Sequence, residues 1–124
     1  MIPNDSHRYR SASKWELQAG DLRGAADHLG KARRLQPQDA ATALLLGQAL
    51  EKIHDLAGAR DALEASPKLL PGQFDAHLLL GQVYMKLKEP NAAEDQFAAA
   101  LLIQPRNSQA VVWMARAKAA SRRK

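Results

Sequence analysis

The fold is decided by residues 40–73, which read AATALLLGQALEKIHDLAGARDALEASPKLLPGQ. Residues of the same kind return on both sides of this stretch at a spacing of 34, as Pro37, Pro71 and Pro105 do. The same interval relates Gly47 to Gly81, Leu46 to Leu80, Ala25 to Ala59 and Ala93, and Leu29 to Leu63 and Phe97. A fixed period of this length indicates an array of structural repeats, each one a small unit that stacks on its neighbours.

The third copy is the clearest, and it reads His77-x2-Leu80-Gly81-x2-Tyr84, then Ala93-x3-Phe97, then Pro105. This pattern resembles the tetratricopeptide repeat (TPR), which reads Trp-x2-Leu-Gly-x2-Tyr, then Ala-x3-Phe, then Pro. His77 is the one departure in this copy. The second copy keeps Leu46-Gly47 and Ala59-x3-Leu63, and the first is weak until it closes with Ala25-x3-Leu29 and Pro37.

The resemblance implies an all-α fold, a right-handed α-solenoid of antiparallel helix pairs with three TPR-like repeats and a C-terminal helix. We expect one TPR domain over residues 1–124, with repeats at about 6–39, 40–73 and 74–107 and the terminal helix at 108–124. The sequence predicts helices at about 6–19, 22–35, 39–53, 56–65, 73–87, 91–103 and 107–121.

Polar and proline residues predict where several helices begin and end. Asp21 and Asp55 are expected to cap helices, because a short carboxylate accepts hydrogen bonds from the free amides of a first turn. Pro90 suits a first helical position, where its missing amide costs little. Pro67 would remove a helical hydrogen bond and clash with the preceding turn. We therefore expect the helix to stop near Ala65, followed by an irregular joint over 66–72 in which Leu69 or Leu70 packs inward.

Charge is unevenly distributed along the chain. The formal net charge is +5, and residues 96–124 hold six Lys or Arg and no Asp or Glu. This basic end could meet an acidic protein, a phosphate backbone or an anionic membrane, or it could simply keep an open solenoid end soluble. No apolar run approaches the roughly 18 residues that a membrane span needs. We expect a cytoplasmic protein, or a periplasmic one if a signal peptide has been removed.

The sequence offers no chemistry of an enzyme or a metal site. None of its four histidines is followed three or four residues later by a second ligand, and the sequence lacks a phosphate-binding glycine loop and a zinc-protease motif. The two tryptophans form no stacking stripe with arginine, which disfavours single-stranded nucleic acid. We therefore expect no catalytic residues, no cofactor and no metal.

The resemblance places a binding groove on the first helix of each unit. The expected partner is a protein or peptide that places an apolar or amphipathic segment in this groove, because Leu44 to Leu46 and Leu78 to Leu80 supply more leucine than a repeat core needs. The extra leucines could also be buried between units, Leu44 and Leu78 more readily than Leu45 and Leu79. The expected groove residues are Arg10, Lys14, Leu44, Leu45, Gln48, Leu78, Leu79, Gln82, Met85, Val112, Trp113 and Arg116.

One branch of the family binds the carboxylate end of chaperone tails through Lys, Asn and Arg side chains. The matching positions are Arg10, Lys14, Leu45, Asp75 and Leu79, and of these only Arg10 could serve. A carboxylate clamp is therefore not expected. We expect a non-catalytic adaptor or assembly scaffold. Two alternatives stay open: a self-associating homo-oligomer, and an adaptor whose basic C-terminal helix binds an acidic or nucleic-acid partner. Nucleic acid and membrane are the less favoured partners.

Overall fold

The structure, a computed structural model, describes residues 20–35, 40–69 and 73–122. These residues form six α-helices, and no strand occurs in the three ranges. The helices are α2 (Leu22–Leu35), α3 (Ala40–Lys52), α4 (Leu56–Leu69), α5 (Phe74–Lys86), α6 (Pro90–Ile103) and α7 (Ser108–Arg122). The all-α fold is confirmed, while the helix predicted at 6–19 lies outside the described residues.

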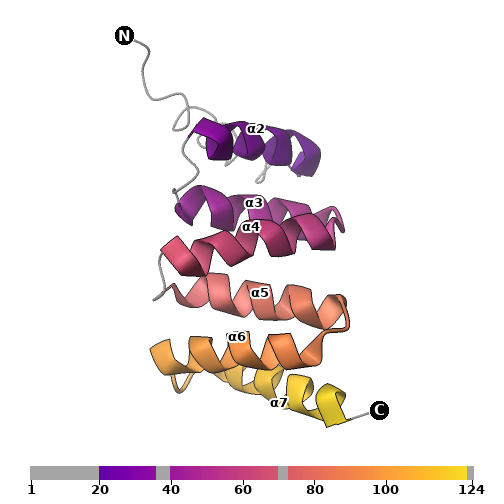
Figure 1. Cartoon of the computed structure of the whole chain (residues 1–124), viewed down its shortest axis with the longest axis vertical. Helices are drawn as coiled ribbons and strands as arrows, with labels where there is room; N and C mark the ends of the chain where they lie inside the picture. The colour runs from indigo at the N-terminus through magenta and orange to yellow at the C-terminus, as the bar shows by residue number, and fades with distance from the viewer. Residues whose placement is uncertain (1–19, 36–39, 70–72, 123–124) are drawn as a thin grey trace.

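The helices form an elongated stack in which each one packs against the next along the chain (Figure 1). Short connections at 53–55 and 87–89 reverse the chain between paired helices, so the pairs are antiparallel. In addition, α3 contacts α5 and α5 contacts α7, so the first helices of successive units touch one another. The arrangement is the expected α-solenoid, with α2 and α7 as the outermost described helices.

Two glycines mark the closest approaches between paired helices. A Cβ atom on Gly81 of α5 would lie 2.8 Å from Cδ1 of Phe97 in α6. A Cβ atom on Gly47 of α3 would lie 2.5 Å from Cδ2 of Leu63 in α4. Phe97 and Leu63 are themselves fully buried. The glycines therefore let large side chains of the second helix reach the backbone of the first.

The buried residues form two clusters along the stack. The first joins α2, α3 and α4 through Ala25, Leu29, Leu46, Ala49 and Ala62. The second runs from α4 to α7 and includes Ala59, Leu63, Phe74, Leu78, Leu80, Val83, Tyr84, Ala93, Phe97, Ala100, Ala110 and Ala117. Small alanines alternate with large leucine and aromatic side chains, so neighbouring helices can approach closely and still fill the space between them.

Helices α2 and α4 begin directly after the aspartates that were predicted to cap them. The Asp21 carboxylate accepts a hydrogen bond from the Gly24 N–H at 3.1 Å, and the Asp55 carboxylate accepts one from the Gly58 N–H at 3.0 Å. A Cβ atom on Gly58 would lie 2.9 Å from Cγ of Asp55. The cap therefore gives a reason for glycine at position 58, because a side chain there would collide with the Asp55 carboxylate. Asn107 caps α7 in the same way.

The turns between paired helices share one backbone conformation. Gly20, His54 and Lys88 stand 34 residues apart, and their φ angles are 85°, 66° and 63°. Glycine adopts such left-handed angles freely, whereas other residues do so at a cost. The Asp55 N–H donates to the Leu50 carbonyl at 2.9 Å, which closes the turn at His54, and an equivalent bond closes the turn at Lys88. The repeat spacing therefore extends to the turns.

The prediction that Pro67 ends its helix near Ala65 is wrong. Helix α4 continues through the proline to Leu69. The proline ring fixes φ near −65°, which is already a helical value, so its main cost is one lost hydrogen bond and crowding against the turn before it. Residues 70–72, the remainder of the expected irregular joint, lie outside the described residues. Pro90, in contrast, occupies the first turn of α6 as predicted.

Candidate functional site

The predicted groove residues fall on three helices that contact one another. Leu44, Leu45 and Gln48 lie on α3, Leu78, Leu79, Gln82 and Met85 lie on α5, and Val112, Trp113 and Arg116 lie on α7. Helix α5, which carries the middle set, contacts both α3 and α7. Arg10 and Lys14 lie outside the described residues.

The 34-residue spacing aligns these side chains into rows across the three helices. Leu45, Leu79 and Trp113 occupy equivalent positions and are all half-buried. Each packs one side against a hydrophobic cluster and leaves another side toward solvent. We call these three residues the apolar row. Its members keep apolar surface that a partner could still cover.

A polar row runs beside the apolar row. Gln48, Gln82 and Arg116 occupy equivalent positions on α3, α5 and α7. The two glutamines are half-buried and Arg116 is exposed. A glutamine amide can both donate and accept hydrogen bonds, so the row can bond to the backbone of an extended or helical segment laid along the apolar row.

Of the two leucines at the preceding position, only Leu78 is buried. Leu78 is 8% exposed and belongs to the hydrophobic cluster, whereas Leu44 is half-buried like Leu45 and packs against the same cluster as Leu78. Burial between units was expected more readily for these two leucines than for Leu45 and Leu79. Leu78 therefore contributes mainly to the core, and the accessible apolar surface of α5 lies at Leu79 and Met85.

At α7 the apolar row ends in an aromatic cluster. The Trp113 ring stacks on the Phe97 ring, with centroids 6.0 Å apart and planes inclined by 24°. The Arg116 guanidinium lies over Trp113 with its Cζ 5.1 Å from the ring centroid. A shallow open pocket of about 230 Å³ adjoins them, lined by Ser108, Gln109, Val112, Trp113 and Arg116. Cation–π contact of this kind holds an arginine in place next to an apolar surface.

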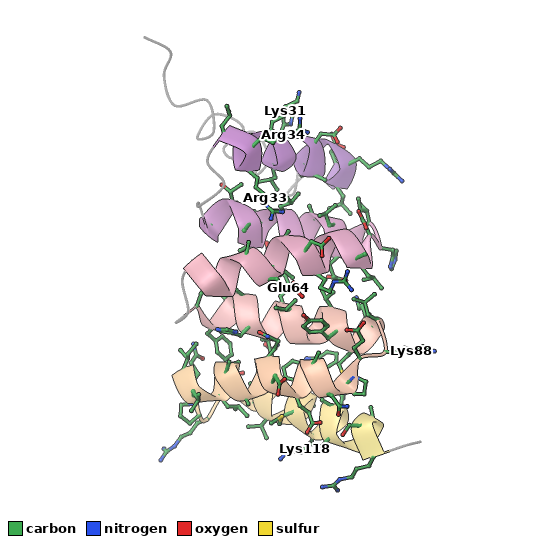
Figure 2. All side chains as sticks on the ribbon, in the orientation of Figure 1. Lys31, Arg33, Arg34, Glu64, Lys88 and Lys118 are labelled. Atoms are coloured by element: carbon green, nitrogen blue, oxygen red, sulfur yellow. The ribbon has the colours of Figure 1, made fainter. Side chains whose placement is uncertain are left out.

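Polar bonds fix α5 against the preceding helices. Tyr84 Oη donates a short hydrogen bond to Glu64 of α4, and Lys86 forms an ion pair with Glu51 of α3. Burial and the bond to the Glu64 carboxylate raise the pKa of Tyr84 to about 12. Both bonds join α5 to the helices of the preceding unit. Figure 2 shows Glu64 between the ribbons of α4 and α5.

The histidine that replaces the family tryptophan has a structural role. His77 is buried, and its Nδ1 lies 3.0 Å from Oε1 of Gln96 in α6. The bond joins the two helices of the third unit at a position where the TPR pattern has an apolar ring. Sequence reasoning missed this pair, because the partner lies 19 residues away on another helix.

Neither a metal-binding cluster nor a membrane-spanning helix occurs among the residues that the structure describes. Among the residues that the structure describes, no group of three or more His, Cys, Asp or Glu side chains could hold a metal ion. Within the same ranges, no helix has the length and apolar character of a bilayer-spanning segment.

The molecule is a helical-repeat solenoid. Its helix pairs stack with a fixed period, a glycine marks the contact within a pair, and partly exposed side chains recur at the same spacing. The sequence matches the tetratricopeptide repeat family over residues 16–73 and again over 55–119. The chain belongs to the tetratricopeptide repeat family. No protein of curated function matches the sequence significantly.

Several solved structures are similar in fold. The first TPR of Spaghetti (RPAP3), bound to the HSP90 peptide SRMEEVD, superposes with a TM-score of 0.90 at 15% identity, covering 98% of this chain and 96% of that one. The Arabidopsis OM64 TPR domain gives 0.87 at 18% identity, covering 94% and 98%. MamA gives 0.91 at 25% identity, covering 96% of this chain and 65% of that one.

Proposed function

We propose that this chain is a non-catalytic protein-interaction module, an adaptor or assembly scaffold. It binds an apolar or amphipathic segment of a partner protein along the first helices α3, α5 and α7. The observation that carries this proposal is the apolar row of Leu45, Leu79 and Trp113, whose half-buried side chains are held at a fixed spacing by a rigid stack.

Structural relatives support the coarser part of the proposal. The Spaghetti (RPAP3) domain is bound to an HSP90 peptide, and the second TPR domain of human RPAP3 is in complex with the HSP70 peptide SGPTIEEVD. The positions that would bind a peptide carboxylate in that branch carry other chemistry here. Leu45 and Leu79 are apolar, and Asp75 is an exposed acid that would repel a carboxylate. An internal apolar or amphipathic segment therefore fits this chain better than a free carboxyl end.

The test changes the two leucines of the apolar row and leaves Trp113 in place. Short random peptides are displayed and selected on the parent protein, and the strongest binder is then measured against Leu45→Gln, Leu79→Gln. Burying a whole leucine is worth about 1.5–3 kcal/mol. Because both leucines are already mostly buried within the protein, we expect the double change to cost about 1–2 kcal/mol of binding free energy, or roughly 5- to 30-fold in affinity.

The matched control is Leu35→Gln, Leu102→Gln. These leucines are 53% and 85% exposed and lie on the second helices α2 and α6, away from the apolar row. The control protein should bind the peptide as the parent does. If Leu45→Gln, Leu79→Gln unfolds, the two leucines belong to the core and the proposal fails. If it folds and binds unchanged, the peptide lies on another surface.

Self-association is the competing function, since the same apolar row could receive a second copy. Light scattering over a dilution series separates the two, because a homo-oligomer must dissociate as the protein is diluted. A mass that falls on dilution in the parent and is already monomeric in Leu45→Gln, Leu79→Gln would replace the adaptor by a homo-oligomeric scaffold.

A further inference from the structure

The starting observation is a charged residue at one end of the polar row. Gln48 on α3 and Gln82 on α5 are neutral, whereas the third member, on α7, is Arg116. Arg116 is exposed, and its Cζ lies 5.1 Å from the centroid of the Trp113 ring. The polar row therefore changes from amides to a cation at α7, so the two ends of the proposed binding surface differ in charge.

The guanidinium of Arg116 keeps its hydrogen-bond donors for a ligand. An arginine side chain carries five N–H donors, and its attraction to an aromatic ring comes from the quadrupole of the ring and needs no acceptor atom. Across residues 20–35, 40–69 and 73–122, no carboxylate or carbonyl pairs with this side chain. Trp113 is itself stacked on the fully buried Phe97, so the ring under the cation is anchored in the core.

The pocket beside the cation offers apolar and charged surface together. Its volume is about 230 Å³, and Val112, Trp113 and Arg116 belong to its lining. Val112 is 48% exposed and Trp113 is half-buried, so the lining keeps apolar surface that an apolar side chain of a ligand can cover. A phosphate backbone would pair with the arginine but leave that apolar surface uncovered, which favours a protein segment over a nucleic acid.

The charges around the groove favour an acidic ligand residue at α7. Arg106, Lys118 and Arg122 are exposed together with Arg116, and residues 96–122 contain no Asp or Glu. Asp75 lies in the first turn of α5 instead, and it is exposed. Opposite charges across an interface favour association and like charges oppose it. An acidic residue of a bound segment is therefore favoured over α7 and disfavoured over the start of α5.

We propose that the α7 pocket binds a glutamate or aspartate side chain of the partner segment, next to an apolar residue that covers Val112 and Trp113. This inference rests on the proposed function and adds the chemistry that the segment carries at one end of the groove. The carboxylate accepts two parallel N–H bonds from the Arg116 guanidinium, whose planar fork matches it. As in the proposed function, the segment is internal, so the acid is a side chain and not a chain end.

The experiment measures an acid preference, defined as the Kd of a peptide with glutamine at one position divided by the Kd of the same peptide with glutamate there. The peptide is the strongest binder selected on the parent protein, amidated at its C-terminus, and fluorescence anisotropy follows its binding. Each Asp or Glu is exchanged in turn for Asn or Gln. One exchange should weaken binding roughly tenfold, because hydrogen bonds to charged groups are stronger than neutral ones. Selected peptides without an acid, or with unchanged binding after every exchange, would overturn the proposal.

Variants of the protein locate the acid. Arg116→Gln should weaken the glutamate peptide far more than the glutamine peptide, so that the acid preference falls to about one, as expected when the charged partner is lost. Arg122→Gln is the matched control, because it removes the same charge from an exposed residue of α7 outside the pocket. This control should keep the acid preference of the parent. An equal loss in both variants would show a general effect of charge and refute the site.

Charge reversal tests whether the pair is direct. Arg116→Glu, combined with a peptide that carries arginine in place of the acid, should recover part of the binding that either change alone loses. Absence of recovery would refute a direct contact. If Arg116→Glu or Arg116→Gln fails to fold, Arg116→Lys replaces it. Lysine retains the charge but loses the planar fork, so the acid preference should fall without vanishing, and an unchanged preference would contradict the proposal.

Other ligands give different results. Recovery of the glutamine peptide by a free C-terminal carboxylate would assign the pocket to a chain end. A phosphoserine that binds far more tightly than the glutamate would assign it to a phosphorylated segment. Salt-sensitive binding of a DNA duplex, weakened alike by Arg116→Gln and Arg122→Gln and without any acid preference, would assign the basic end of the chain to nucleic acid. Each of these results would overturn the proposal.

The proposed function and this inference fail in different ways. Leu45→Gln, Leu79→Gln should weaken the glutamate and glutamine peptides alike and so leave the acid preference as in the parent. If that double change weakens binding while Arg116→Gln leaves the acid preference unchanged, the proposed function stands and this inference fails. If the double change leaves binding unchanged, the proposed function fails, and this inference fails with it.

Discussion

Replacing Gly81 by alanine tests the packing that sets the spacing of the helix pairs. Two effects of opposite sign meet at this position. Alanine in place of glycine inside a helix stabilises by about 1 kcal/mol. The added Cβ, however, would lie 2.8 Å from both Cδ1 and Cζ of Phe97, and overpacking of a filled core costs about 1–3 kcal/mol. Phe97 is fully buried and stacked on Trp113, so its ring has little room to turn away.

We therefore expect Gly81→Ala to destabilise the fold by about 1 kcal/mol on balance, from the magnitudes given for the two effects. Gly30→Ala is the matched control, because a Cβ on Gly30 of α2 would meet no described atom within 4 Å, and it should stabilise by about 1 kcal/mol. Gly47→Ala should fall between them, since its neighbour Leu63 is more flexible than a ring. Urea titrations followed by circular dichroism measure all three. A gain for Gly81→Ala equal to that of Gly30→Ala would refute the close approach of α5 and α6.

Three further predictions concern turns, a buried hydroxyl and a cap. His54→Gly and Lys88→Gly should each stabilise the fold by about 1 kcal/mol, because glycine relieves the left-handed backbone; unchanged urea midpoints would contradict this. The pKa of Tyr84 is raised from 10.0 to about 12. The neutral hydroxyl therefore stabilises the folded state below pH 10, and this stabilisation is lost as the pH rises toward 12 and the hydroxyl ionises. Tyr84→Phe should therefore unfold with a weaker pH dependence in this alkaline range, and parallel curves for the two proteins would exclude the bond to Glu64. Asp55→Ala should cost about 1 kcal/mol through loss of the helix cap, whereas a melting temperature equal to the parent's would show that the cap contributes nothing.

Much of the fold could be predicted from sequence because the repeat spacing constrains every unit at once. Gly47 and Gly81, one repeat apart, make equivalent helix contacts, and Asp21 and Asp55 cap the helices assigned to them. Pro67 departs from its prediction for a local reason. It lies in the last turn of α4, so only Lys68 and Leu69 of the helix follow the missing hydrogen bond.

The candidate site was less predictable. Periodicity identifies which residues share a face, but the rotation of one helix against the next decides how much of each side chain stays exposed. Leu78 and Leu79 are neighbours of the same type, yet one is buried and the other half-buried. The pairs Tyr84 with Glu64 and His77 with Gln96 join different helices. Nothing in the spacing of one helix indicates a partner on another.

The recurrence of the left-handed turn at His54 and Lys88 has a consequence for how the length of this chain can change. Both residues leave a first helix at the same point and with the same backbone angle, φ 66° and 63°. Deleting residues 54–87 would join Ile53 to Lys88 and place α3 directly before α6. Gly47 would then face Phe97 across the same kind of contact that Gly81 makes now. Insertions and deletions of whole 34-residue repeats therefore preserve the contact between a glycine and the large side chain of the next helix, whereas a change of one or a few residues within a helix shifts the glycine out of line with that side chain.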